Sequence, residues 1–313
     1  MKSIKLIIVF LFFCATLVAQ DDTDLMKQLE KDSNKTSYTT ATFKSTRLIT
    51  GHTIETPGKG ILDVRILHRF APINRGLYDF FGLDYASMRL GFDYGITNNI
   101  MVGIGRSTWQ KTYDALFKIK ILKQSTGAVN MPVTLTFVST FATRSDLARK
   151  DTLNNRILIN FADRTSFSEQ LIVSRKFSNN FSLQFMPIFI FNHNKIDSIN
   201  TYTKNKDNIV YGQKRKNTFA LGFGGRLKVS KRVAINLEYY YQMPDAKPGI
   251  RFNSLSLGVD IETGGHIFQM HFTNSNGMTE KSFITDTDDK WRDGYIRFGF
   301  NISRVFTVGR RKK

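Results

Sequence analysis

The sequence is short of cysteine, proline and acidic residues. Its 313 residues include one cysteine, Cys14, and six prolines. A lone cysteine can form no internal disulfide, and so little proline excludes collagen-like or proline-rich material. Asp and Glu number 26 against 45 Lys and Arg, which leaves a formal net charge of +19. Because 41% of the residues are hydrophobic, a wholly disordered chain is also excluded.

Long hydrophobic runs are absent except at the N-terminus. Lys2 and Lys5 precede an unbroken apolar run at residues 6–13, and small residues follow it. This order is typical of a secretory signal, and the run is shorter than the about 20 residues that a membrane-spanning helix needs. We predict that residues 1–20 are a cleaved signal peptide. Cys14 would leave with it, so the mature chain would hold no thiol for a metal site or a nucleophile.

The rest of the chain alternates between apolar and polar residues. Between positions 86 and 96 the even residues are apolar or alanine and the odd ones are small or charged. Neighbouring side chains of a β-strand point to opposite faces, so each such run predicts a strand with one apolar face. We count about twelve strands, each long enough to cross a bilayer at a tilt. The clear runs are 62–70, 86–96, 113–121, 181–191, 219–229, 233–242, 255–261 and 296–306, and the weaker ones are 99–109, 131–141, 167–178 and 264–274.

The connections between these runs alternate in length. Short turns are expected at 97–98, 124–130, 178–179, 231 and 263–264, and longer loops at 71–83, 142–166, 194–217, 244–250 and 275–292, with one short link at 110–111. Short periplasmic turns and long outer loops are typical of outer-membrane barrels. We therefore predict an all-β fold, a single antiparallel transmembrane β-barrel at residues 60–308 in the outer membrane, with a basic periplasmic tail at 309–313. A soluble β-sandwich also alternates, but its strands are shorter.

Aromatic residues gather near the ends of the apolar stripes. Rings of this kind prefer the headgroup level of a membrane, where they form girdles around a barrel. The predicted girdle residues are Tyr94, Tyr113, Phe189, Phe191, Tyr239, Tyr241 and Phe306.

The segment before the first strand, residues 21–59, differs in kind. A short amphipathic helix around Leu25 is followed by a Ser/Thr-rich stretch with Lys and Arg. The segment could be a flexible periplasmic arm or a plug that enters the lumen, and the residues do not decide between the two.

Several short motifs carry a family resemblance. They stand at 49–56, 68–70, 80–86, 93–97, 103–107 and 111–114, followed by 164, 170–171, 175–177, 186–187 and 302–306. In this order they resemble an uncharacterised family of outer-membrane β-barrel proteins from Bacteroidota-type bacteria. The resemblance implies fold and location only. One departure is that many such barrels end on an aromatic residue, whereas seven residues follow Phe306 here.

The inward-facing side of the predicted strands is rich in charge. The candidate lumen-lining residues are Asp63, Arg65, Arg69, Arg89, Asp93, Lys118, Lys120, Lys176, Arg226, Lys228, Glu238 and Arg297. A lumen with positive potential would favour anions. The alternative is a network of internal salt bridges that closes and stiffens the barrel.

Motifs for metal or cofactor binding are weak. Asp286, Asp288 and Asp289 share one loop but lack the spacing of a calcium loop. His266 and His271 lie five positions apart, on opposite faces of one strand, and cannot share a metal within it. We predict no metal and no cofactor.

An enzymatic site is also poorly supported. Some barrels carry lipid-hydrolysing Ser and His on the outer wall, and Ser107 with His68 is the best pair here. The predicted strand order places another strand between them, so we predict that the protein is not an enzyme.

The leading functional prediction is a channel or transport pore with a basic, anion-favouring lumen. The main alternative is a non-conducting envelope scaffold or surface receptor acting through the outer loops, and a rim-located lipid hydrolase comes third. The expected partners are outer-membrane lipids, the barrel-assembly machinery and a small anionic solute. Nucleic acid is not expected, because the loop cations at 204, 206 and 214–216 would meet lipid phosphates.

Overall fold

The computed structural model describes residues 35–145, 161, 164–192, 217–243 and 251–308. The predicted signal peptide, the helix around Leu25, the loop cations at 204–216 and the tail at 309–313 lie outside these residues. Within the described ranges, no helix is both long and apolar enough to cross a membrane.

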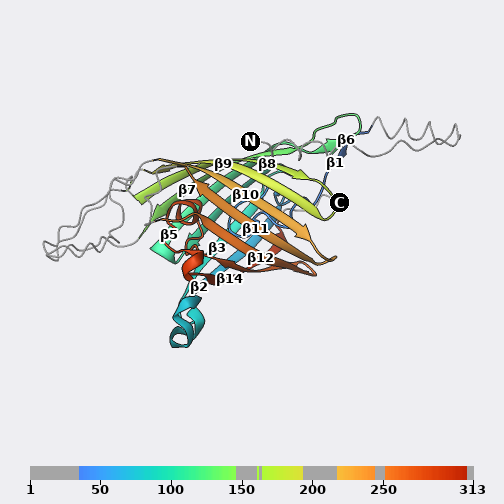
Figure 1. Ribbon diagram of the computed structural model, residues 1–313. Coiled ribbons are helices and arrows are strands. Elements are labelled where there is room, and N and C mark those ends of the chain that lie inside the picture. The colour runs from blue at the N-terminus through green and yellow to red at the C-terminus, as the bar shows by residue number, and fades with distance from the viewer. Residues whose placement is uncertain (1–34, 146–160, 162–163, 193–216, 244–250, 309–313) are drawn as a thin grey trace, which may run out of the picture.

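Twelve long strands form one closed antiparallel barrel (Figure 1). Each strand pairs with its neighbours in the chain, and β14 pairs with β2 to close the cylinder. Closure leaves no unpaired strand edge, which a lipid environment requires. The predicted fold class and strand number are confirmed, including the four weaker runs. The strands are β2 (Ile61–Pro72), β3 (Ala86–Gly95), β4 (Ile100–Ser107), β5 (Thr112–Leu122), β7 (Thr134–Arg144), β8 (Thr165–Lys176), β9 (Phe181–Asn192), β10 (Thr218–Lys228), β11 (Val233–Gln242), β12 (Ser254–Thr263), β13 (His266–Thr273) and β14 (Arg297–Thr307).

The two ends of the barrel differ as the connection lengths predict. At one end the strands are joined by short turns, such as the turn after β3, where Thr97 N donates to Ile100 O at 3.1 Å. At the other end the chain forms the 3-10 segment η2 (Ile73–Gly82) and the helix α2 (Glu280–Thr285). The link between β4 and β5 is tight, and Gln110 and Lys111 both have positive φ. We refer to the two ends as the short-turn end and the outer end.

The outer surface of the wall is apolar. Side chains such as Phe92, Phe117 and Leu237 are 37%, 40% and 48% exposed, although they are large and hydrophobic. All seven predicted girdle residues lie on this face. A polar pair lies within it, since Ser139 Oγ donates to Glu169 Oε1 at 2.9 Å. Such a surface is suited to contact with lipid.

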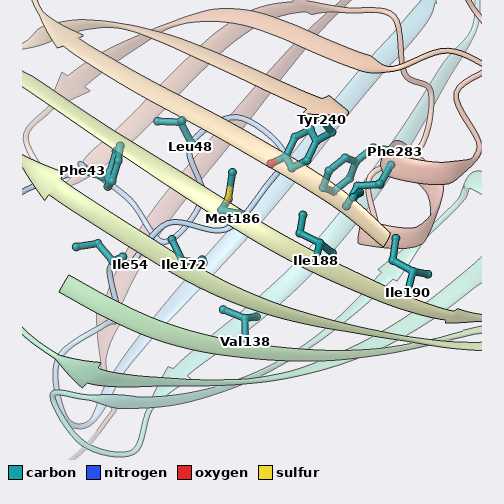
Figure 2. Packing of buried hydrophobic residues seen from close by; sticks show 12 residues of the cluster. Phe43, Leu48, Ile54, Val138, Ile172, Met186, Ile188, Ile190, Tyr240 and Phe283 are labelled. Carbon is teal, nitrogen blue, oxygen red and sulfur yellow. The ribbon is translucent and has the colours of Figure 1, made fainter. Parts of the chain in front are cut away.

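The lumen is occupied by two inserts from the rest of the chain. The first is the arm, residues 42–56, most of which is buried. The second is the outer insert, residues 274–289, which contains α2. The arm is attached at the short-turn end, where β1 (Ser37–Tyr38) pairs with β6 (Ser125–Thr126) in a separate two-stranded sheet. Figure 2 shows arm residues Phe43, Leu48 and Ile54 inside the barrel, beside side chains of the wall.

Candidate functional site

The arm folds into a tight hairpin inside the barrel. Thr53 N donates to Thr46 O at 3.0 Å, and Leu48 N donates to Gly51 O at 2.9 Å, so residues 48–51 form its tip. These two hydrogen bonds satisfy only part of the hairpin backbone. The remaining buried N–H and C=O groups need partners from the barrel wall.

Wall side chains provide those partners at the tip. The carboxylate of Glu238 accepts hydrogen bonds from the backbone N–H groups of Ile49, Thr50 and Gly51 at 2.7, 3.1 and 3.1 Å. From β13 and β14, Gln269 Nε2 donates to Leu48 O at 2.6 Å and Asn301 Nδ2 donates to Ile49 O at 2.8 Å. The wall therefore recognises the backbone of the tip, which explains why so polar a segment can be fully buried.

Gly51 is required by the closeness of Tyr240. A Cβ atom at position 51 would lie 1.7 Å from the Tyr240 hydroxyl oxygen. The Tyr240 ring is itself buried and packs edge-on against Phe283 of α2, with centroids 4.9 Å apart. A larger residue at 51 would therefore meet a ring that has little room to move.

Basic wall residues bind the base of the hairpin. Lys118 Nζ donates to the carbonyl oxygens of Thr46, Thr53 and Glu55 at 3.1, 3.0 and 3.2 Å. Arg65 Nη2 donates to Thr46 Oγ1 at 2.7 Å. The ammonium group of Lys118 has three donors, and burying a cation is costly unless its donors are paired. In the described structure all three acceptors of Lys118 come from the arm.

The two inserts meet at a buried ion pair. Arg47 Nη1, from the arm, donates to Glu280 Oε1, from α2, at 2.9 Å, and His52 Nε2 lies 3.1 Å from the same oxygen. Arg69 of the wall contacts both inserts: it donates to Ser275 O at 3.0 Å and to Thr50 Oγ1 at 2.8 Å. The arm and the outer insert are thus held together in the middle of the barrel.

One side of the lumen is apolar. The arm residues Phe43, Leu48 and Ile54 belong to a buried cluster with inward-facing side chains of β7 to β11 and with α2 (Figure 2). The wall and α2 members are Val138, Ile172, Met186, Ile188, Ile190, Ala220, Tyr240, Phe283 and Ile284. This cluster was not predicted from the sequence, although residues 185–191 are apolar at every position, which is the signal of a strand with two apolar faces.

The predicted lumen-lining residues all occupy inward-facing strand positions. Eight are buried, namely Asp63, Arg65, Arg69, Arg89, Asp93, Lys118, Arg226 and Glu238, and four are partly exposed, namely Lys120, Lys176, Lys228 and Arg297. Some form ion pairs: Arg65 with Asp63 at 2.6 Å, Arg297 with Asp289 at 2.5 Å, and Arg89 with Asp114. The plug residues Arg47 and Glu280 were missed, because no local pattern links them.

The pair Ser107 and His68 does not form a catalytic site. His68 stacks on Phe300 on the outer face, with centroids 4.8 Å apart, whereas Ser107 is buried on the lumen side. The two side chains therefore lie on opposite sides of the wall, in addition to being separated by β3. In the part of the chain that the structure describes, no three His, Cys, Asp or Glu side chains come together as a metal site.

A closed antiparallel cylinder with an apolar outside and a polar, occupied inside defines the class: the protein is a membrane β-barrel with an internal plug. The chain belongs to the family described as membrane bound beta barrel domain (DUF5777), whose model matches residues 43–306. The match confirms the family resemblance, and it includes the arm as well as the strands.

Solved structures of similar shape are outer-membrane barrels. The NanC porin shares 10% identity over 79% of this chain and 98% of its own, with a TM-score of 0.46. The KdgM porin shares 9% identity over 79% of this chain and 99% of its own, with a TM-score of 0.45. The COG4313 outer membrane channel from Pseudomonas putida F1 shares 13% identity over 81% of this chain and 98% of its own, with a TM-score of 0.44. No curated protein matches the chain.

Proposed function

We propose that the protein is a gated channel of the outer membrane. In the resting state the arm and the outer insert close the lumen, and solute passes when the arm withdraws. The observation that carries this proposal is that the plug is a hairpin with both ends at one end of the barrel. Thr39 N donates to Gln124 O at 2.8 Å, and Lys59 N donates to Asn98 Oδ1 at 3.1 Å. Gln124 and Asn98 belong to short turns, so the arm can leave without threading past any strand.

The nature of the contacts also favours a plug that moves. Glu238, Gln269, Asn301 and Lys118 bind backbone atoms of the arm, and each of these polar groups can be solvated by water once the arm has left. A barrel closed permanently by its own side chains would not need a separate hairpin.

An open lumen would favour anions. Cations outnumber carboxylates at the inward-facing strand positions, and withdrawal of the arm would remove all three described acceptors of Lys118. Field lines concentrate in a narrow tube with low-dielectric walls, so an excess of positive charge there selects anions. The cargo we propose is a small anionic solute.

Planar-bilayer recording of a variant that lacks residues 42–56 tests the proposal. The intact protein is expected to be closed most of the time, and the deletion variant to conduct with an anion-selective reversal potential. Adding Lys118→Met to the deletion should reduce this selectivity. Arg106→Met is the matched control, because Arg106 lies on the outer face over Tyr113. A deletion variant that folds and inserts but stays silent would instead support the non-conducting scaffold.

The plug is also expected to respond to pH through His52, which belongs to the arm and not to a membrane-spanning strand. Burial lowers the pKa of His52 to about 3, and the nearby Arg47 and Lys118 act in the same direction. In a withdrawn arm the imidazole would regain its ordinary pKa near 6.5. Above pH 6.5 the imidazole of His52 is neutral in both states, and the seated arm has its full stability. As the pH falls from 6.5 toward 3, His52 is protonated only in the withdrawn arm, and the seated arm loses stability.

At pH 5 the expected loss is about 2 kcal/mol, which is about a 30-fold increase in the open fraction. Glu280 raises the pKa of His52 and so offsets part of its lowering, but the titration of Glu280 itself does not contribute in this pH range. Burial alone would raise the pKa of Glu280, but Arg47 and His52 outweigh it and hold the pKa well below its usual range. Glu280 therefore stays ionised between pH 5 and 8. The measurement is open probability against pH, and His52→Gln should flatten the curve. An unchanged curve in that variant would exclude His52 as the titrating group.

A further inference from the structure

A cluster of exposed apolar side chains projects from the outer end of the barrel. It lies on the rim segment, residues 73–85, which comprises η2 and the residues that lead into β3. Figure 1 shows η2 standing away from the barrel wall. Its most exposed apolar residues are Leu77, Tyr78, Phe80, Phe81, Leu83 and Tyr85, which are 79%, 89%, 59%, 49%, 40% and 61% exposed. So many large apolar side chains in one short segment usually mark an interaction surface.

The rim segment is held firmly at its base. Ile73 N donates to Ile296 O at 2.8 Å, and Arg75 Nη1 donates to Asp79 Oδ2 at 2.8 Å. Gly82 has φ of 85°, and a Cβ there would lie 2.3 Å from Ala71 O, so only glycine allows this close return to β2. The exposure of the apolar side chains is therefore a property of a defined conformation.

Backbone strain accompanies the exposure. Phe80 and Phe81 have φ of 46° and 55°, in the left-handed region that aromatic residues rarely adopt. Strain of this kind persists where the surrounding structure imposes it, and it clusters at functional positions. Two adjacent aromatic rings are kept exposed here at a cost in backbone energy.

The apolar surface of the rim segment is continuous with the lipid-facing wall. Tyr85 leads directly into β3, whose Met88 is 40% exposed on the outer face. On the neighbouring strands, Phe70 stacks on Phe298 with ring centroids 5.8 Å apart. An apolar surface that extends the membrane-facing wall sideways at its end would lie at the level of the lipid headgroups.

We infer that the rim segment is a lipid-binding anchor, which inserts its aromatic and leucine side chains into the leaflet at the outer end of the barrel. Its ligand is the boundary between headgroups and acyl chains. The segment carries Arg75, Asp79 and Asp84, and Arg75 pairs with Asp79. Without a net positive charge it has no electrostatic attraction for lipid phosphates, so its binding should depend on apolar burial and hardly on salt.

Depth-dependent fluorescence quenching tests the inference with the full chain. Leu77→Cys, in a Cys14→Ser background, would carry an environment-sensitive label in vesicles of phosphatidylcholine with brominated acyl chains. We expect the label at 77 to be quenched at least half as strongly as one at Leu237 in the outer wall. The matched exposed control is Ser145→Cys, at the end of β7, where quenching should be at most a tenth of that value. Raising salt from 0.1 to 1 M should change the quenching at 77 by less than a fifth.

Two results would overturn the inference. The first is a label at position 77 that behaves like the one at 145, which would show that the segment stays in water. The second is efficient disulfide formation between two copies at Leu77→Cys in dilute vesicles, which would show that a second copy of the chain covers the surface. Neither result bears on conductance, so the channel proposal is tested separately.

Discussion

Replacing Glu280 by alanine is expected to unseat the arm and open the lumen. The change would leave Arg47, which is 2% exposed, without its carboxylate partner inside the barrel. Removing one member of a buried ion pair typically costs about 3–5 kcal/mol, because an uncompensated charge remains. This corresponds to a change of about 150- to 5,000-fold in the equilibrium between seated and withdrawn arm.

Trypsin cleavage after Arg47 measures the unseating directly. In the seated arm this peptide bond is inside the barrel, and in the withdrawn arm it is accessible from the short-turn end. Glu280→Ala should therefore accelerate cleavage at this site and raise the open probability together. A rise in conductance without faster cleavage would mean that the outer insert, and not the arm, had moved.

An exposed ion pair supplies the matched control. Lys44 of the arm lies 2.6 Å from Glu262 of the wall, and their side chains are 30% and 38% exposed. Pairs this exposed contribute little to stability, so Glu262→Ala should change cleavage after Arg47 less than about fivefold. The double replacement Arg47→Met with Glu280→Met should raise the open probability less than either single one, because no buried charge is then left alone. Open probability is the measurement here, since Arg47→Met removes the cleavage site.

The strands could be predicted because their signal is local. Which face of a strand meets lipid follows from alternation within ten residues, and Arg89 or Asp93 could be placed inward from their immediate neighbours alone. Barrel closure followed from strand length, an even count and the alternation of short and long connections. None of these inferences needs a contact between distant parts of the chain.

The plug could not be predicted because its contacts join distant positions. Arg47 and Glu280 are 233 residues apart in sequence, and Ile49 is 189 residues from Glu238. The hydrophobic residues of the arm recur with neither the period of two of a strand nor the period of 3.6 of a helix. The conformation of the arm is set by wall side chains and not by its own sequence pattern. The apolar half of the lumen was also missed, although a run such as 185–191 gives an apolar inner face in either register, because the arm and α2 that cover this face come from distant parts of the chain.

Enlarging Gly51 is expected to prevent the tip from seating. In Gly51→Ala the new methyl group would lie 1.7 Å from the Tyr240 hydroxyl oxygen and 2.9 Å from Tyr240 Cζ. Overpacking of a well-packed site costs about 1–3 kcal/mol, and this contact belongs at the upper end because Phe283 restrains the ring. We expect about a 100-fold shift toward the withdrawn arm, measured as cleavage after Arg47 and as open probability.

Gly58, two residues beyond the arm, distinguishes this steric effect from a general loss of glycine. A Cβ at Gly58 would lie 3.6 Å from Ile61 Cγ1, which is an ordinary contact, so Gly58→Ala should leave both measurements within about twofold. Combining Gly51→Ala with Tyr240→Phe removes the nearest atom and should recover part of the loss, since the two positions are in direct contact. If Gly51→Ala seats as well as the intact arm, the tip does not occupy the place beside Tyr240 from which the gating proposal starts.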